Sequence, residues 1–302
     1  MKKDFISLIR KNQTFFAYKP HLVENPDFVF VAATGLAEHA MRYYRLSEFL
    51  KNHNVQLYCI DHPGQGSFTK DLGVWKEDGF NTCVDNLNTL VQHAKKDNPE
   101  KKVILFGHSM GSFISLAYIQ KYSDVDACIL SGTNDKQAYL LLKVAIGLAK
   151  MQKFFVGRDK KSKLLNTLSF GQFNKQFAPN RTEFDWLSTD DEEVDLYVKD
   201  PLCGFVPTVG LFHDLFQAFG HIYRPENIEK IPKDLPIYLF AGSKDPVGAN
   251  GKGPTSLSER LKGAGIKNVS LKIYENYRHE CLNEKGNDIV MKDIYNFCTT
   301  IL

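Results

Sequence analysis

The sequence predicts an α/β protein with a mostly parallel sheet flanked by helices and an inserted, largely helical cap. Short apolar runs alternate with stretches of helical spacing, which is typical of parallel strands joined by helices. One apolar run ends in Gly107-His108-Ser109-Met110-Gly111, directly before a helical stretch. The alternation lapses over residues 133–224 and then resumes. We therefore expect a core formed by residues 1–132 and 225–302, and a cap formed by residues 133–224.

The composition is that of an ordinary globular protein. The chain has 302 residues, of which 43% are hydrophobic and 24% charged, and this length suits one large domain with an insertion. The formal net charge of +3 is small, so we expect no nucleic-acid partner. The cysteines are scattered without a C-x-x-C pair, which argues against a disulfide framework or a zinc site and favours a reducing compartment.

The sequence contains no evident targeting signal or membrane span. The apolar stretch at residues 5–9 is short, ends at Arg10-Lys11-Asn12-Gln13, and lacks the features of a signal peptide. No run approaches the roughly 20 apolar residues of a membrane span. We expect a cytoplasmic protein without a transmembrane segment, and its oligomeric state stays open.

Each expected element follows from its hydrophobic pattern. The strands are expected at residues 14–18, 27–34, 55–60, 102–106, 125–130, 236–241 and 269–274. The run at 27–34 is nearly all apolar, as in a strand covered on both faces, and the run at 102–106 is apolar and partly β-branched, as in a buried strand. The helices have apolar residues at helical spacing and lie at residues 41–51, 77–96, 112–122, 253–263 and 287–302. In the cap we expect an apolar helix at residues 138–150 and an aromatic, Leu-rich segment at residues 201–219.

The motif at residues 107–111 predicts a nucleophilic serine. A strand, a sharp turn that holds Ser109 between two glycines, and a helix form the nucleophile elbow, in which the serine hydroxyl stands clear of the backbone. Side chains at positions 107 and 111 would collide with the neighbouring strand and helix. The helix points its N-terminus at the reacting oxygen, where it favours developing negative charge.

A base and an orienting acid are expected after two later strands. In the elbow arrangement the chain order is Ser, then Asp or Glu, then His. Asp245 follows the strand at 236–241, and His279 follows the strand at 269–274. Because ligand-binding residues lie beyond the carboxyl ends of parallel strands, we expect these two residues to complete a catalytic triad with Ser109. Taken alone, Asp245 also fits a turn before a proline, and His279 fits a surface histidine.

Two main-chain N–H groups are expected to form an oxyanion hole. Met110 follows the nucleophile, and Leu36 follows an early strand, where Gly35 permits close backbone approach. The chain has no G-x-x-x-x-G-K-[ST] loop and no G-x-G-x-x-G fingerprint, and the acidic run at 190–193 fits a solvated helix start better than a metal site. We expect neither a metal nor a cofactor.

These motifs resemble those of the α/β-hydrolases of the monoacylglycerol lipase and lysophospholipase group, which is classed with the serine aminopeptidase-like hydrolases. The matching motifs span nearly the whole chain, are weakest between residues 135 and 185, and lie at 34–39, 42–43, 61–67, 107–111, 200–202, 242–247 and 278–280. This group usually has a histidine where the chain has Thr34.

The resemblance implies an α/β-hydrolase fold and a role for each site residue. It implies Ser109 as the nucleophile, His279 as the general base and then acid, and Asp245 as the orienting acid. It also implies an oxyanion hole at the N–H groups of Leu36 and Met110.

Our first hypothesis is a serine hydrolase, an esterase that cleaves monoacylglycerols or lysophospholipids through an acyl-enzyme. We expect substrate contacts from Glu38, His39, Arg42 and Phe205, and transient contact of the cap with a membrane or micelle surface. One alternative is a short-chain carboxylesterase, or an amide or peptide hydrolase, with the same triad. Another is a non-catalytic binding protein of the same fold, which is disfavoured because no triad residue is missing.

Overall fold

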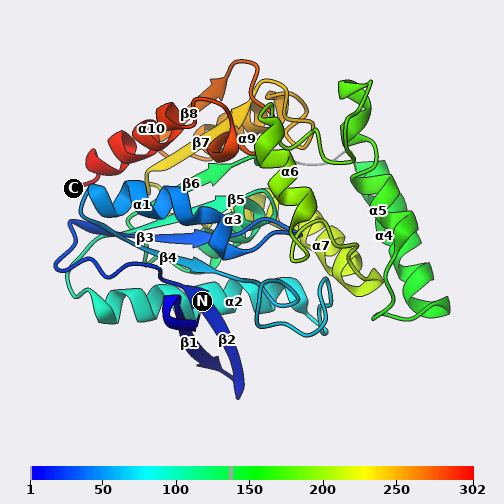
Figure 1. The fold of residues 1–302 in the computed structure, drawn as a ribbon, viewed down its shortest axis with the longest axis horizontal. Coiled ribbons are helices and arrows are strands. Elements are labelled where there is room, and N and C mark those ends of the chain that lie inside the picture. The colour runs from blue at the N-terminus through cyan, green and yellow to red at the C-terminus, as the bar shows by residue number, and fades with distance from the viewer. Residues whose placement is uncertain (1, 136–138) are drawn as a thin grey trace.

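In the computed structural model, which describes residues 2–135 and 139–302, helices cover both faces of one eight-stranded sheet (Figure 1). The strands, in chain order, are β1 (Phe5–Arg10), β2 (Gln13–Tyr18), β3 (Phe28–Ala33), β4 (Val55–Ile60), β5 (Val103–His108), β6 (Ala127–Ser131), β7 (Ile237–Gly242) and β8 (Val269–Tyr274). Their order across the sheet is β1-β2-β4-β3-β5-β6-β7-β8. The pairings β1–β2 and β2–β4 are antiparallel and the others are parallel, which confirms the mostly parallel α/β sheet.

The helices fall between the strands as the sequence pattern predicts. The α-helices are α1 (Tyr44–Asn52), α2 (Gly79–Asp97), α3 (Met110–Lys121), α4 (Tyr139–Phe155), α5 (Lys163–Ser169), α6 (Asp191–Lys199), α7 (Val209–Ile222), α8 (Pro225–Ile228), α9 (Lys252–Gly263) and α10 (Asp288–Thr299). Short 3₁₀ helices are η1 (Lys2–Asp4), η2 (Ala40–Tyr43), η3 (Phe173–Phe177) and η4 (Cys281–Asn283). Within the described residues, no helix combines the length and apolar character needed to cross a membrane.

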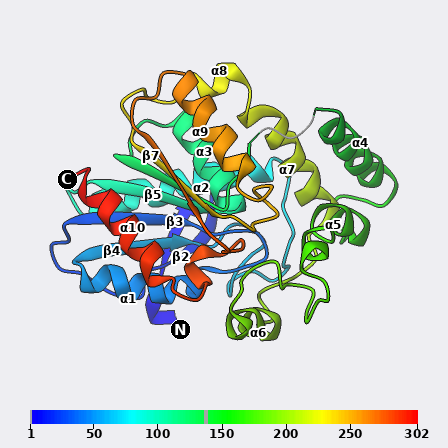
Figure 2. The ribbon, with the colours of Figure 1, turned by 90° about the horizontal axis from the view of Figure 1, so that it is seen from above.

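The central strands are buried on both faces, which explains their continuous apolar sequence. In β3, Phe28, Phe30 and Ala32 belong to the apolar cluster beneath α1 and α10. Val29 and Val31 point the other way, into the larger cluster with α2, α3 and α9. The helices therefore form one layer on each face of the sheet (Figures 1 and 2).

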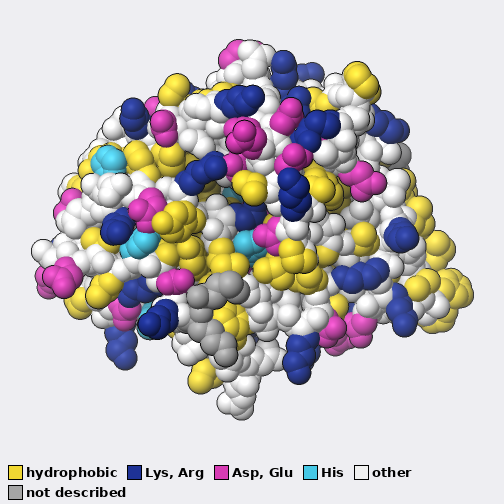
Figure 3. All heavy atoms as spheres, in the orientation of Figure 1, with side chains coloured by type: hydrophobic (Ala, Val, Ile, Leu, Met, Phe, Trp, Pro, Cys, Tyr) yellow, Lys and Arg dark blue, Asp and Glu magenta, His cyan; other side chains and the backbone are white. Residues whose placement is uncertain are grey.

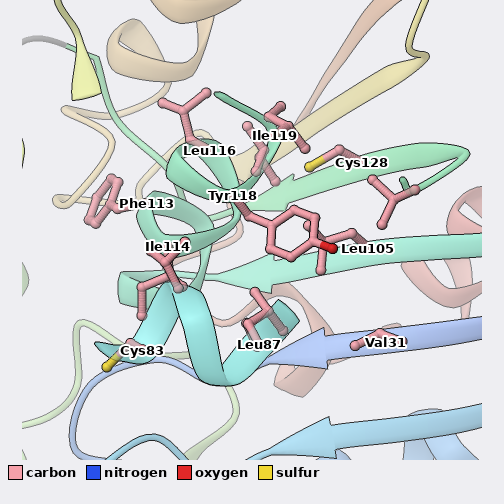
Figure 4. Close-up of a cluster of buried hydrophobic side chains, with 14 of the residues drawn as sticks. Val31, Cys83, Leu87, Leu105, Phe113, Ile114, Leu116, Tyr118, Ile119 and Cys128 are labelled. Carbon is pink, nitrogen blue, oxygen red and sulfur yellow. The ribbon is translucent and has the colours of Figure 1, made fainter. Parts of the chain in front are cut away.

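Helix α3 is anchored by apolar side chains along most of its length. Ile114 and Tyr118 are fully buried and pack near Leu87 of α2 and Leu105 of β5 (Figure 4). Burial of a large apolar side chain stabilises a fold by about 1.5–3 kcal/mol. This packing fixes where α3 begins, and so fixes the turn at residue 109 directly before it.

The N-terminal hairpin was not predicted from the sequence. β1 pairs with β2 in continuous antiparallel register. The two residues between them, Lys11 and Asn12, have φ values of +48° and +60°, as in a type I′ turn. Asn tolerates this conformation, but Lys seldom adopts it. The turn therefore lacks the Asn-Gly signature by which such hairpins are recognised.

The insertion between β6 and β7 has a small core of its own and also joins the main core. Ala149 of α4, Leu165 of α5 and Phe212 of α7 form a separate buried cluster with Phe216. Another residue of α7, Leu211, belongs to the main cluster with α2 and α3. Helix α7 thus lies between α4 and α5 and the rest of the protein (Figure 2). Residue 138, where a helix was expected to begin, lies outside the described residues, and α4 continues to Phe155 rather than ending at 150.

Candidate active site

Ser109 lies in a strained turn between β5 and α3. Its φ of +52° and ψ of −119° form a conformation that residues with a side chain rarely adopt. Its N–H donates to the carbonyl oxygen of Ser131 in β6 at 2.9 Å. Its carbonyl oxygen accepts a hydrogen bond from the Ser112 hydroxyl at 2.6 Å. These two bonds hold the turn in the shape required of a nucleophile elbow.

Gly107 and Gly111 are required by close packing around this turn. A Cβ at position 107 would lie 2.2 Å from the carbonyl oxygen of Gly111, and a Cβ at position 111 would lie 2.1 Å from that of Ala33. Both obstacles are backbone atoms, which cannot move aside as a flexible side chain can. The predicted collisions with the helix and with a neighbouring strand are therefore confirmed.

His279 and Asp245 form a buried pair beyond the carboxyl ends of β8 and β7. Asp245 is 0% exposed and His279 is 1% exposed. The Nδ1 of His279 lies 2.9 Å from Oδ1 of Asp245. Because an ionised carboxylate only accepts, Nδ1 carries the proton and Nε2 keeps its lone pair. Nε2 has no hydrogen-bond partner among the described residues, so this nitrogen is available to take a proton.

The surroundings of His279 favour its protonated form. Burial alone would lower the pKa of the imidazole, but the charge and hydrogen bond of Asp245, with further charge from Glu280 and Glu38, raise that pKa above 6.5. The Trp186 ring lies 5.1 Å from the imidazole, measured between ring centroids. An imidazole with a raised pKa takes a proton readily, as a general base must.

Two other histidines near the site remain neutral. Burial, together with the charge of His279, lowers the pKa of His108 to about 4, although the two rings lie only 4.8 Å apart. Burial lowers the pKa of His62 to about 3. Neither imidazole takes up a second proton at neutral pH, so His279 is the better candidate for the base.

The loop at residues 34–39 packs against the nucleophile turn. A Cβ at Gly35 would lie only 3.2 Å from Cβ of Ser109. Among the described residues, the N–H of Leu36 has no acceptor. The N–H of Met110 belongs to the first turn of α3, where helix amides have no partner within the helix. Both expected oxyanion donors thus lie in segments adjoining Ser109, and their role stays a prediction.

Gln65 holds this oxyanion loop. Its Nε2 donates to the carbonyl oxygen of Gly35 at 2.9 Å, and its Oε1 accepts from the N–H of Ala37 at 3.3 Å. Thr34, which stands where the resembled group has histidine, donates its hydroxyl proton to the carbonyl oxygen of Ile60 at 3.1 Å. Gln65 had no predicted role. The only signal was its place in the motif at 61–67.

A buried ion network joins the oxyanion loop to the loop after β8. Glu38 Oε1 accepts from the Gly35 N–H at 2.5 Å and from the Tyr43 hydroxyl at 3.0 Å. Arg42 donates to Glu38 at 2.9 Å and, through both arms, to Glu280 at 2.7 Å each. Glu38 and Arg42 are thus engaged within the protein, and their expected contact with substrate stays a prediction. Glu280 had no predicted role, and the only sequence signal was its position next to the candidate base.

The insertion contacts both of these loops. The Gly204 N–H and the Tyr197 hydroxyl both donate to the carbonyl oxygen of Ala37, at 3.0 Å and 2.8 Å. The N–H of Glu280 donates to the carbonyl oxygen of Leu187 at 2.7 Å. The insertion therefore forms part of the framework of the site.

His39 and Phe205 lie where the insertion meets the core. His39 Nε2 lies 2.8 Å from Oδ2 of Asp200. Phe205 packs near Gly73, and the Lys161 ammonium lies 5.5 Å from its ring centroid. Their expected contact with substrate also stays a prediction.

Comparisons with known proteins identify relatives over most of the chain. The family model described as serine aminopeptidase, S33, matches residues 24–286. A monoacylglycerol lipase of Mycolicibacterium smegmatis is 26% identical over 291 residues, which are 92% of this chain and 90% of the relative. A monoglyceride lipase of Rattus norvegicus is 29% identical over 261 residues, which are 84% of this chain and 76% of the relative.

The fold is also similar to that of a solved esterase. A highly thermostable carboxyl esterase from Bacillus coagulans, solved in complex with glycerol, superposes with a TM-score of 0.91 at 25% identity, over 98% of each chain. The α/β-hydrolase fold implied by the sequence motifs is confirmed.

Proposed function

Because the chain belongs to the serine aminopeptidase (S33) family of α/β-hydrolases and is a carboxylic-ester hydrolase acting on lipid esters, we propose that its substrates are single-acyl lipids, monoacylglycerols or lysophospholipids. The proposed chemistry rests on the buried pair of His279 and Asp245, whose Nδ1 and Oδ1 atoms lie 2.9 Å apart. Both residues lie in loops that follow β8 and β7, which come after β5 and β6 across the sheet. The strained turn at Ser109 supplies the nucleophile.

The reaction proceeds through an acyl-enzyme. Ser109 Oγ attacks the ester carbonyl carbon while His279 Nε2 takes the hydroxyl proton. The N–H groups of Leu36 and Met110 stabilise the resulting oxyanion. The bond to the alcohol breaks as His279 returns the proton to the leaving oxygen, and the acyl group stays on Ser109. A water molecule, deprotonated by His279, then attacks the acyl ester and releases the fatty acid.

The exposed apolar surface of the cap, residues 133–224, supports a lipid substrate. On α4, Leu141, Phe154 and Phe155 are 69%, 82% and 77% exposed. Apolar side chains gather at the edge of the molecule where α4 and α5 lie (Figure 3). Lysines also occur on α4, at positions 143, 150 and 153. Since apolar side chains beside lysines favour binding to an anionic interface, we place this face of the cap on the membrane or micelle that holds the substrate.

A hydrolysis series tests the substrate and the nucleophile together. Purified protein is assayed on p-nitrophenyl esters of increasing chain length, on monoacylglycerol and on lysophosphatidylcholine. Medium or long single-chain lipids should be preferred, and Ser109→Ala should lower kcat by about 10⁵-fold or more. Ser115→Ala is the matched control, because its buried hydroxyl on α3, the helix that follows Ser109, has no hydrogen-bond partner among the described residues. Full activity of the Ser109 variant would contradict the mechanism.

A binding assay tests the cap surface separately. Phe154→Ser combined with Phe155→Ser should weaken sedimentation with anionic lipid vesicles and slow hydrolysis of vesicle-borne monoacylglycerol. It should leave hydrolysis of a water-soluble ester unchanged, because both rings are largely exposed. Unchanged vesicle binding would refute the assignment of this face.

A short-chain carboxylesterase is the second candidate, favoured by the structural similarity to the Bacillus coagulans carboxyl esterase. Activity that falls steadily beyond the shortest acyl chains would decide for it, and hydrolysis of amides but not esters would decide for an amide or peptide hydrolase. All six cysteines are free and buried, which fits a reducing compartment, so we assign the protein to the cytoplasm as part of this proposal.

A further inference from the structure

Three side chains with metal-ligating atoms meet where the oxyanion loop contacts the insertion. They are His39, at the end of that loop, and Asp200 and Cys203, which follow α6. An imidazole nitrogen, a carboxylate oxygen and the thiol sulfur all lie within 4.8 Å of one another. His39 and Asp200 are 161 positions apart in the chain, so no short sequence motif predicts the cluster.

The surroundings of the cluster suit a cation. His39 is 4% exposed and Cys203 is 9% exposed, whereas the Asp200 side chain is 30% exposed and leaves a path from solvent. His39 makes one side-chain hydrogen bond, from Nε2 to Asp200, and its Nδ1 has no partner among the described residues. One nitrogen can therefore ligate a metal while the other remains free for a hydrogen bond, as is usual for metal-bound histidine.

The Arg42 guanidinium, whose charge acts on both Asp200 and Cys203, does not oppose a cation strongly. The Arg42 guanidinium stacks near the Tyr197 ring, 4.9 Å from its centroid, but both of its arms are paired with buried carboxylates. A neutral imidazole, a carboxylate and a thiolate together carry two negative charges. They would balance a divalent cation, so the loaded site would be electrically neutral in this buried position.

We propose that His39, Asp200 and Cys203 form a binding site for a divalent cation of the zinc class. Nitrogen, sulfur and carboxylate oxygen are the ligands that Zn²⁺ prefers, and three protein ligands leave one position for water. Binding releases the thiol proton to solvent as the metal–sulfur bond forms. Zinc–ligand bonds of roughly 2.0–2.3 Å at tetrahedral angles hold the ligand atoms about 3.3–3.7 Å apart. Binding would therefore break the 2.8 Å contact between His39 and Asp200 and rearrange the three side chains around the ion.

Occupancy of this site slows ester hydrolysis, a consequence that rests on the proposed function. His39 lies three residues after the proposed oxyanion donor Leu36. Moving His39 from its hydrogen bond with Asp200 to a metal ion shifts the loop that carries this donor, and a displacement on the order of 1 Å in such a group lowers turnover by up to about 100-fold. The metal concentration would thus control the activity through the contact between the cap and the core.

Cobalt binding tests the site without reference to activity. Untagged full-length protein, first treated with a chelator, is titrated with Co²⁺, and we expect one ion per chain with a thiolate-to-cobalt charge-transfer band in the near ultraviolet. Cys203→Ser, which keeps the side-chain shape, should remove the band, and Asp200→Asn should weaken binding at least about ten-fold. Cys298→Ala removes a buried thiol of α10 and is the matched control, which should keep the band.

The same proteins are then assayed with Zn²⁺ on a soluble ester. Zn²⁺ should lower kcat about ten-fold or more in the unmodified protein and in the Cys298 variant, reversibly on adding chelator, and less than about two-fold in the Cys203 variant. Absence of the cobalt band, or a band that survives Cys203→Ser, overturns the proposed site. A protein that binds cobalt as expected but cleaves no ester would instead count against the proposed function.

Discussion

Removing the guanidinium of Arg42 should destabilise the protein and slow catalysis together. Arg42 makes three charge-assisted hydrogen bonds, of 2.7 Å, 2.7 Å and 2.9 Å, and its side chain is 11% exposed. Arg42→Met would leave Glu38 and Glu280 buried without their cation. Breaking a buried ion pair on one side costs about 3–5 kcal/mol, a large part of the 5–15 kcal/mol typical of a folded domain. We also expect kcat to fall about 10- to 100-fold, because the network links the oxyanion loop to the loop that carries His279.

The assay is urea unfolding at pH 7, paired with kcat on a short p-nitrophenyl ester. Arg45→Met is the matched control, since Arg45 pairs with Glu193 at 2.5 Å but is 53% exposed, and loss of such a surface pair should cost less than about 1 kcal/mol. Adding Glu280→Gln to Arg42→Met should recover part of the loss, with a coupling energy of about 2 kcal/mol. If Arg42→Met costs no more than the Arg45 control, the reasoning about the network is refuted.

The effect of Arg42→Met should depend on pH. Burial raises the pKa of Glu280, but the Arg42 guanidinium outweighs burial and lowers it below the ordinary 4.5. A carboxylate with a depressed folded-state pKa stabilises the protein above its unfolded-state value and loses this contribution as the pH falls toward the folded-state value. The difference in unfolding free energy between the unmodified protein and Arg42→Met should therefore narrow below pH 4.5. A constant difference would assign the loss to packing rather than charge.

Three other substitutions probe separate parts of the site. Asp245→Asn should lower kcat about 10⁴-fold. It should also shift the acidic limb of the pH profile of kcat/KM to lower pH, because the pKa of His279 is then no longer raised. An unshifted limb would contradict the pairing of the two residues. Gly111→Ala should lower the free energy of unfolding by about 3 kcal/mol or more, measured by thermal unfolding, because the new Cβ would collide with backbone atoms. The control is Gly147→Ala, which has open space around it and should stabilise α4 by up to about 1 kcal/mol. Gln65→Leu should lower kcat about ten-fold with little change in KM, since the lost bonds position the oxyanion loop rather than the substrate, and a rise in KM alone would refute that role.

Sequence patterns predicted the strands whose residues are buried in a regular pattern. β4 was placed at its observed bounds because its residues are all buried, and such an apolar run between turn residues has few other stable arrangements. The edge strand β8 was also placed at its observed bounds, because its apolar residues alternate with exposed polar ones. β1 was missed since it is an edge strand with only partly buried residues and ends in a Lys-Asn turn that carries no hairpin signature. Hydrophobic patterns therefore predicted the central strands and the edge strand β8, and failed at the opposite edge, β1.

The candidate site could be predicted in part, and the limit is set by distance along the chain. Asp245 and His279 each follow a predicted strand, so topology alone indicates that they lie at the same edge of the sheet. The partners of Arg42 could not be found in this way, because Glu280 is 238 positions away and its role depends on side-chain geometry. Both oxygens of Glu38 are engaged within the protein, an arrangement that no sequence pattern indicated, and its expected contact with substrate stays a prediction.

Because hydrogen bonds join the cap to Ala37 and Glu280, the cap and the two loops that contain these residues must change together during evolution. Trimming the chain to its sheet and flanking helices would remove the Tyr197 and Gly204 donors from the oxyanion loop, so the product would not be a smaller esterase. Transplanting a cap from a relative would have to bring matching donors and acceptors to both loops. Exchanging the cap is therefore a restricted route to a new substrate range in this protein. Each new cap must also restore the hydrogen bonds that hold the two loops in place.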